Sequence, residues 1–217
     1  MSDVEIRIVD DPAGVAADLL NELAGHVALS GGSTPGRVYE LAAQRRPDWS
    51  GAHVWFGDER AVPPGDERSN YRLARTKLLD ALSRPPELHR IRGERPAEEA
   101  AALYDEELDG VTLDLALNGI GPDGHTASLF PGSPALAERE RRAVAAEAGL
   151  EPLVQRVTLT APTFAATRLL VYLVTGESKA EAVRRAFAEE PSAETPASLI
   201  RGVETIAILD AAAASKL

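Results

Sequence analysis

Short apolar runs alternate with longer amphipathic stretches along most of the chain. Runs rich in β-branched and aliphatic residues are typical of buried strands, whereas apolar residues spaced three to four apart indicate helices. We expect strands at 26–29, 52–56, 113–117, 156–160, 169–174 and 205–209. We expect helices from Asp11-Pro12 to about residue 23, and at 35–44, 70–82, 97–108 and 178–188, with a short one around 126–130.

Strand–helix alternation of this kind predicts an α/β fold: three layers, with a mostly parallel Rossmann-like sheet and helices on both faces. No stretch rich in Gly, Pro or Ser divides the chain, so we expect one domain over 1–217. In open sheets of this class, ligands bind outside the carboxyl ends of the strands. The loops that leave the strands are therefore where chemistry is expected.

Composition narrows the functional classes. The 217 residues are 44% hydrophobic and 26% charged, as in an ordinary globular protein, and the formal net charge is −11. A negative field opposes binding to nucleic acid and to anionic membranes, and no apolar run is long enough to cross a bilayer. The absence of cysteine excludes disulfides and a thiol nucleophile.

Location and assembly can be predicted only from the absence of signals. Residues 1–10 are acidic and lack the basic and apolar regions of a signal peptide, so we expect a cytoplasmic protein. The ending Ser215-Lys216-Leu217 matches a peroxisomal address, but three residues carry little information. No long apolar helix face is left over, and we therefore expect a monomer.

The first candidate site is the glycine-rich segment that follows strand 26–29 and opens a helix. It contains Gly31, Gly32, Ser33 and Thr34, followed by Pro35. Free N–H groups at a helix start bind anions, and Ser33 or Thr34 can cap the helix with Pro35 in its first turn. The segment is not a P-loop, because no Gly-Lys-Ser/Thr follows. A tight turn without a ligand is the alternative.

The second candidate follows strand 52–56 and contains Asp58, Glu59 and Arg60. The guanidinium fork of Arg60 is suited to an anionic oxygen, and Asp58 would then face sugar hydroxyls. Asn70, after Ser69, could reach the same ligand, while Ser69 is expected to cap the next helix. The alternative is a solvated, salt-bridged turn.

The third candidate carries the strongest signal. A buried strand runs into the segment 119–131, where three closely spaced glycines precede His125 and Asp123 stands two residues before it. Histidine titrates near neutrality and suits proton transfer, and Asp123 could orient its ring or stabilise its cation. Metal binding is the competing idea, but none of the four histidines has another at metal-site spacing, so we expect no metal.

The fourth candidate is Lys179, which follows Gly176 at the start of a helix after strand 169–174. A lysine in the first turn places its ammonium next to the positive end of the helix dipole, which is unfavourable unless a bound anion compensates both positive charges. An exposed lysine with no ligand is the alternative. The chain contains no Gly-x-Ser-x-Gly elbow and no cysteine, so direct attack by water is favoured over a covalent intermediate.

Taken together, these segments resemble the 6-phosphogluconolactonase family over about 8–210. The resemblance rests on 119–131, the most specific part, and on 30–35, 58–60, 69–71, 156–160, 176–180 and 196–200, all in the expected order. It implies a fold shared with glucosamine-6-phosphate deaminases, and hydrolysis of a phosphorylated sugar lactone without cofactor or metal.

The resemblance also implies roles for individual residues. His125 would activate water for attack on the lactone carbonyl and return the proton to the ring oxygen, with support from Asp123. The loop of Ser33 and Thr34, together with Arg60 and Lys179, would hold the phosphate. Asn70 and Arg156 would line the pocket.

Two rival functions remain at this stage. In the amino-sugar phosphate deaminases the Gly-x-Asp-Gly-His segment typically continues with Ile-Ala-Phe-Asn-Glu-Pro, whereas here Thr126-Ala127-Ser128 follows. Those enzymes have Tyr where this chain has Arg60. Both differences favour the lactonase. A non-catalytic sugar-phosphate sensor is the second rival, but it would have no need of the Asp123–His125 pair.

Overall fold

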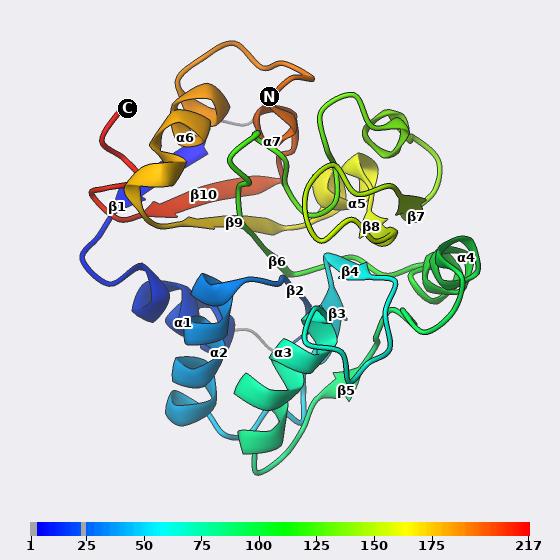
Figure 1. The fold of residues 1–217 in the computed structure, drawn as a ribbon. Coiled ribbons are helices and arrows are strands. Elements are labelled where there is room, and N and C mark those ends of the chain that lie inside the picture. Colours follow the sequence, from blue (N-terminus) through cyan, green and yellow to red (C-terminus); the bar gives the residue numbers. More distant parts are fainter. Residues whose placement is uncertain (1–3, 23–24) are drawn as a thin grey trace.

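The computed structural model describes residues 4–22 and 25–217 (Figure 1). Its main sheet has seven strands in the order β1-β10-β9-β6-β2-β3-β5, and every neighbouring pair is parallel. The strands are β1 (Val4–Ile8), β2 (His26–Leu29), β3 (His53–Phe56), β5 (Glu87–Leu88), β6 (Leu115–Asn118), β9 (Leu169–Val174) and β10 (Glu204–Leu209).

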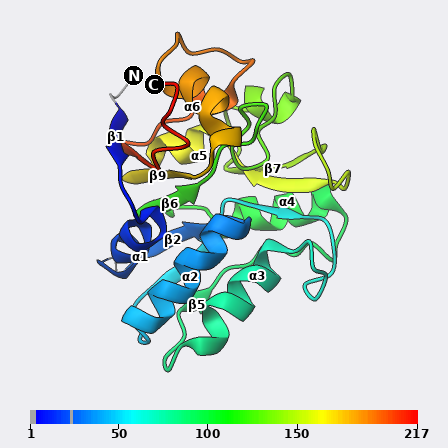
Figure 2. The same ribbon diagram turned by 60° about the vertical axis from the view of Figure 1, so that its left-hand side comes forward.

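Helices cover both faces of this sheet, which confirms the expected three-layer α/β fold. In Figures 1 and 2, α1 (Pro12–Glu22), α2 (Ser33–Arg45) and α3 (Asn70–Lys77) lie together on one face. The opposite face is covered by α4 (Ala97–Glu107), α5 (Ala161–Ala166), α6 (Ala180–Phe187) and α7 (Pro196–Leu199). Short 3-10 turns occupy Leu79–Ala81, Pro134–Ala137 and Glu177–Lys179.

A second sheet, which the sequence pattern did not indicate, lies on the face of α4 and α5. It is antiparallel, in the order β4-β8-β7, and consists of β4 (Asp58–Arg60), β8 (Arg156–Leu159) and β7 (Ala143–Ala146). The carboxylate of Asp105 in α4 accepts hydrogen bonds from the backbone N–H groups of Arg142 (2.6 Å) and Ala143 (3.2 Å). This sheet brings β4 and β8 to the edge of the cleft described below.

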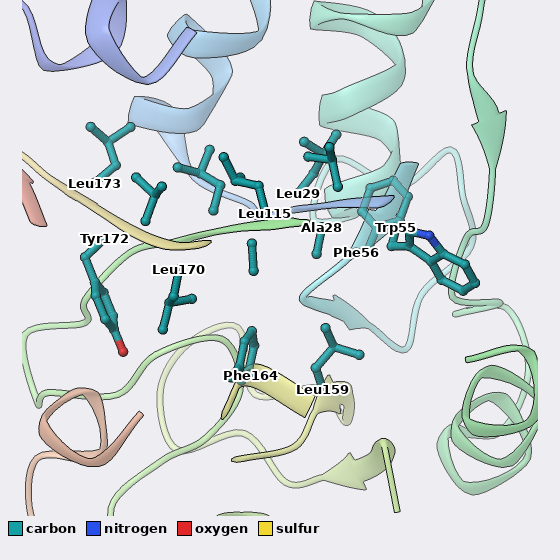
Figure 3. Close-up of a cluster of buried hydrophobic side chains, with 14 of the residues drawn as sticks. Ala28, Leu29, Trp55, Phe56, Leu115, Leu159, Phe164, Leu170, Tyr172 and Leu173 are labelled. Carbon is teal, nitrogen blue, oxygen red and sulfur yellow. The ribbon is translucent and has the colours of Figure 1, made fainter. Parts of the chain in front are cut away.

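The core lies on both faces of the main sheet, which explains why its strands are continuous apolar runs. Tyr172 and Leu173 are neighbours on β9, both are buried, and they point to opposite faces (Figure 3). The hydroxyl of Tyr172 donates to the backbone oxygen of Ile200 at 2.9 Å, so this buried polar group is satisfied. A strand buried on both sides cannot alternate apolar and polar residues.

The expected strands and the longer helices are confirmed, with shifts at their ends. The strand expected at 113–117 is observed at Leu115–Asn118, and the helix expected at 70–82 ends at Lys77 before a 3-10 turn. The expected end of the first helix, residue 23, lies outside the described residues. Among the helices that the structure describes, none has the length and apolarity needed to cross a bilayer.

The prediction of a short helix around 126–130 is wrong. Gly124 and Ala127 have φ values of 91° and 49°, in the left-handed region that a right-handed helix cannot use. The hydroxyl of Ser128 donates to the Asp58 carboxylate at 2.6 Å and ties the segment to β4. The segment is an ordered loop fixed by tertiary contacts.

The strand order creates a switch point at the centre of the sheet. From β2 the chain proceeds to β3 and β5 on one side, while β6 leads to β9 and β10 on the other. Loops that leave β2 and β6 at their carboxyl ends therefore diverge, and a crevice opens between them.

Candidate active site

A cleft of about 570 Å³ lies at the carboxyl ends of the central strands. It draws residues from the segments that follow β2, β6 and β9, from β4 and the start of α3, and from the loop before β8. Its lining consists of Ser30, Gly31, Gly32, Asp58, Arg60, Asn70, Gly119, Ile120, Gly121, Pro122, His125, Ala127, Leu150, Glu151 and Lys179. Four segments predicted separately from the sequence therefore meet in one place.

The loop after β2 depends on glycine for close packing. A Cβ on Gly31 would lie 1.9 Å from Oδ1 of Asn70, so only glycine fits there. Gly32 has a φ of 112° and is the N-cap of α2, without any side-chain capping bond. The expected cap by Ser33 or Thr34 is therefore wrong, although Pro35 does lie in the first turn.

Ser33 and Thr34 do not line the cleft with their side chains. Ser33 is exposed, and the Thr34 hydroxyl lies 3.0 Å from the hydroxyl of Thr175, which follows β9. Their position in the first turn of α2 nevertheless leaves their backbone N–H groups without intrahelical partners, as at any helix start. An anion-binding role for this loop would thus rest on its backbone.

His125 is held by the loop that follows β6. Its Nδ1 lies 2.6 Å from Oδ1 of Asp123, which also accepts a hydrogen bond from the His125 backbone N–H at 3.1 Å. Since a carboxylate can only accept here, Nδ1 carries the proton and Nε2 is left as the basic nitrogen. The ring packs against Phe130, with centroids 4.5 Å apart, and its side chain is 22% exposed.

Backbone contacts fix the same loop. A Cβ on Gly121 would lie 2.0 Å from Nδ1 of His125, so the imidazole lies directly against the Gly121 backbone. The Gly121 N–H donates to the His125 carbonyl at 2.8 Å, and the Gly124 N–H donates to the Gly121 carbonyl at 2.9 Å. The loop therefore positions His125 rigidly, which a proton-transfer group requires.

Asp58 and Glu59 of β4 are both buried, and each holds a different part of the site. One oxygen of Asp58 accepts from the Asn70 amide at 2.9 Å, and the other accepts from the Ser128 hydroxyl at 2.6 Å. Asp58 thus lines the cleft and also ties the start of α3 to the loop of His125. This structural bond to Ser128 was not anticipated from the sequence.

Glu59 anchors the start of α3. Its carboxylate accepts from the backbone N–H groups of Arg60, Asn70 and Tyr71 and from the Ser69 hydroxyl, at 2.7 to 2.9 Å. Burial raises the pKa of Glu59, and these four hydrogen bonds oppose that rise. Ser69 caps α3 as expected, because its oxygen accepts from the Arg72 N–H at 3.1 Å.

Arg60 and Arg156 lie side by side, since they are direct partners in the β4–β8 register. Arg156 is buried, at 4% exposure, and does not itself line the cleft. Its terminal nitrogen donates to the Pro152 carbonyl at 2.9 Å, and Arg60 donates to the Arg68 carbonyl. Burial and the neighbouring Arg60 both lower the pKa of Arg156, whereas the charges of Asp58 and Glu59 oppose this shift.

Each guanidinium of this pair keeps an unsatisfied donor. The Nε atoms of Arg60 and Arg156 are buried and have no hydrogen-bond partner among the residues that the structure describes. Two adjacent cations with buried, unpaired donors are costly unless an anion compensates them. The pair therefore favours an anionic ligand at this side of the cleft.

Lys179 lies at the end of the 3-10 turn that follows β9, and its side chain lines the cleft. Burial lowers the pKa of Lys179, and the charge of Asp123 opposes this shift. A half-buried ammonium whose charge is disfavoured by burial gains from an anion close by. Lys179 and the arginine pair thus bring positive charge to an otherwise acidic protein.

Several cleft residues were not among the candidates. Ser30 directly follows β2, and its buried hydroxyl has no hydrogen-bond partner in the described part of the chain. Leu150 and Glu151 come from the loop before β8, where nothing in the sequence pattern marks a site. The glycine-rich segment next to Ser30 was a signal that could have identified it. Residues 150–151 reach the cleft through the pairing of β4 with β8, which the sequence pattern does not show.

The fold and the cleft define an α/β protein with a positioned histidine beside positively charged groups at a switch point. The sequence from residue 8 to residue 208 matches the model of the glucosamine-6-phosphate isomerase/6-phosphogluconolactonase family. The chain belongs to this family. It is 37% identical to 6-phosphogluconolactonase of Mycobacterium leprae, over 88% of this chain and 84% of that protein.

Further relatives agree with this assignment. The chain is 40% identical to human 6-phosphogluconolactonase, over 81% of this chain and 73% of the human protein. The solved structure of 6-phosphogluconolactonase from Trypanosoma cruzi has a TM-score of 0.88, with 27% identity over 100% of this chain and 98% of that one. A monomeric glucosamine-6-phosphate deaminase has a TM-score of 0.86 at 20% identity, over 100% of both chains, and shares the fold.

Proposed function

We propose that this protein hydrolyses 6-phospho-D-glucono-1,5-lactone to 6-phospho-D-gluconate, the second step of the oxidative pentose phosphate pathway, with His125 as its acid–base residue and without a metal. The observation that carries this proposal is the Asp123–His125 pair in a cleft with buried cationic donors. The relatives named 6-phosphogluconolactonase support the choice of substrate.

The chemistry assigned to His125 follows from its tautomer. With Nδ1 protonated toward Asp123, Nε2 can take a proton from a water molecule as that water attacks the lactone carbonyl carbon. The resulting imidazolium is stabilised by the Asp123 carboxylate. As the tetrahedral intermediate collapses, the bond from carbon 1 to the ring oxygen breaks. Nε2 returns the proton to that oxygen, which leaves as the hydroxyl on carbon 5.

Positive charge in the cleft is suited to the phosphate. Lys179 and Arg60 line the cleft, and Arg156 supports Arg60 from the adjacent strand position. The first turn of α2 adds backbone N–H groups. These groups hold the phosphate, and the reactive carbonyl of the substrate then lies next to His125. The binding energy of the phosphate thus orients the carbonyl toward His125. Asn70 shapes the cleft through its contact with Gly31.

The protein's charge bears on its partners. The net charge of −11 supports a protein that binds neither nucleic acid nor membranes. The predicted monomer and the cytoplasmic location accord with a small metabolic enzyme that acts on a diffusible sugar phosphate. The peroxisomal reading of Ser215-Lys216-Leu217 stays a separate prediction.

An assay with two substrates tests the proposed reaction. Purified protein, with a chelator present, is given freshly generated 6-phosphogluconolactone and, separately, glucosamine 6-phosphate. We expect lactone hydrolysis well above the spontaneous rate and no release of ammonia. Ammonia release with lactone hydrolysis at the spontaneous rate would instead identify a deaminase, and binding of sugar phosphates without either reaction would identify a sensor.

A further inference from the structure

Three of the four histidines gather outside the cleft: His26 and His53 lie at the amino ends of β2 and β3, and His89 comes directly after the two-residue strand β5. His53 opens β3 and is paired in register with Glu87, the first residue of the edge strand β5. His89 follows β5 directly. The cleft lies at the carboxyl ends of the central strands, so this cluster is separate from the proposed active site.

Potential ligand atoms of His53, Glu87 and His89 converge on one point. Nδ1 of His53 lies 3.1 Å from Nε2 of His89. The two carboxylate oxygens of Glu87 lie 3.5 Å from the His53 nitrogen and 3.6 Å from the His89 nitrogen. All three groups have a ligand atom within 4.8 Å of the others. A single ion bonded to atoms about 2.0–2.1 Å away fits between such groups with little movement.

His89 is already arranged as a ligand. Its Nδ1 lies 2.6 Å from the carboxylate of Glu107, at the end of α4, so that nitrogen carries the proton and Nε2 faces His53 with its lone pair. Its ring stacks on Trp55, with centroids 3.9 Å apart and an interplanar angle of 4°. A carboxylate behind a ligating histidine fixes its tautomer and raises its basicity, which is the usual arrangement around bound metals.

His26 completes the cluster but differs from a ligand. Its Nδ1 accepts a hydrogen bond from the Trp55 indole at 2.9 Å and is therefore occupied. Its ring stacks on His53, with centroids 4.4 Å apart. His26 is therefore not among the three groups whose ligand atoms converge, and it offers a matched control within the same cluster.

We propose that His53, Glu87 and His89 form a binding site for a divalent first-row transition metal ion such as Zn²⁺. Two imidazoles and one carboxylate are the donor set that such ions prefer, whereas Mg²⁺ and Ca²⁺ prefer oxygen ligands. The side chain of Glu87 is 65% exposed, so water can fill the remaining position. The ion would clamp the two-residue edge strand β5 to β3 and, through Glu107, to α4.

Calorimetric titration of the chelator-treated, metal-free protein with ZnCl₂ tests this site. We expect one Zn²⁺ per chain, and at least tenfold weaker binding in His53→Gln and in Glu87→Gln, both of which alter solvent-accessible side chains. His26→Gln should bind within about threefold of the unchanged protein. MgCl₂ should give no saturable binding. Zn²⁺ should also raise the melting temperature of the unchanged protein, but not that of Glu87→Gln.

Three results would overturn the proposal. The first is a metal-free protein that binds no stoichiometric Zn²⁺, in which case the histidines only hydrogen-bond to each other. The second is binding in His53→Gln and Glu87→Gln as tight as in the unchanged protein. The third is loss of binding in His125→Ala, which would place the ion in the cleft. Circular dichroism of each variant ensures that weaker binding is not caused by unfolding.

Discussion

Gly121 offers the sharpest test of whether the position of His125 controls activity. In Gly121→Ala, the new Cβ would lie 2.0 Å from Nδ1 of His125 and 2.8 Å from Oδ1 of Asp123. The imidazole would have to retreat by about 1.4 Å to reach the 3.4 Å at which ordinary contact begins. Misplacement of a catalytic group by about 1 Å can cost ~10²-fold in rate, or about 2.7 kcal/mol of transition-state stabilisation.

We therefore expect kcat for lactone hydrolysis to fall about a hundredfold in Gly121→Ala, with the spontaneous rate subtracted. KM should change little, because the phosphate-binding groups lie on other segments. Gly51→Ala, outside the cleft, is the control, since a Cβ there would have nothing within 4 Å beyond its chain neighbours, and it should retain activity within about fivefold. Full activity of a folded Gly121→Ala would show that close contact with the Gly121 backbone does not control the position of His125.

Three further changes test other parts of the site. Arg60→Met should raise KM for the phosphorylated lactone about ten- to a hundredfold, because Arg60 lines the cleft and its lost charge serves the phosphate. The slow hydrolysis of unphosphorylated gluconolactone should stay unchanged, and equal effects on both substrates would argue against that role. Ser128→Ala leaves an oxygen of the buried Asp58 carboxylate without its hydrogen-bond donor. The free energy of unfolding, measured with urea, should therefore fall by about 1.5–3 kcal/mol. A decrease below about 0.5 kcal/mol would show that the bond contributes little to stability. Burial lowers the pKa of Lys179 below its ordinary value of 10.5, so its positive charge is lost earlier as the pH rises. The affinity for 6-phosphogluconate, measured by calorimetry, should consequently fall with rising pH below 10.5 and lose this slope in Lys179→Met.

The central strands and the place of the His125 loop in the cleft could be predicted because their signals are local. Leu169–Val174 and His26–Leu29 are apolar runs of strand length, and they were assigned with their observed bounds. Asp123 and His125 follow closely spaced glycines at the end of a strand. This local pattern indicates a candidate site even when the fold is not known. Lys179 was identified in the same way, from a charge in an unfavourable place.

The second sheet and its consequences could not be predicted because they depend on distant pairing. Asp58–Arg60 is a short polar strand, and Ala143–Ala146 is rich in alanine, a residue of low β-propensity. The pairing of Arg60 with Arg156 joins residues almost a hundred positions apart in sequence. His53 and His89 likewise meet only because β5 pairs with β3, so histidine spacing along the chain carried no sign of their contact.

The loop at 126–130 shows a different limit of the sequence pattern. Its residues suit a short helix, but the left-handed conformation of Ala127 and the bond from Ser128 to Asp58 require an irregular loop. Tertiary contacts override weak local preference in so short a segment. At the start of α2, likewise, Gly32 occupies the N-cap position where Ser33 or Thr34 was expected.

The most direct test of the central claim is the rate of 6-phosphogluconolactone hydrolysis by the unchanged protein and by His125→Ala, measured together with a chelator present. We expect clear acceleration by the unchanged protein and a loss of about 10²–10⁴-fold in the variant, the usual contribution of a positioned acid–base group. His26→Gln, which removes a histidine outside the cleft, should keep its activity. Equal rates for His125→Ala and the unchanged protein would contradict the assignment of His125 as the group that activates water.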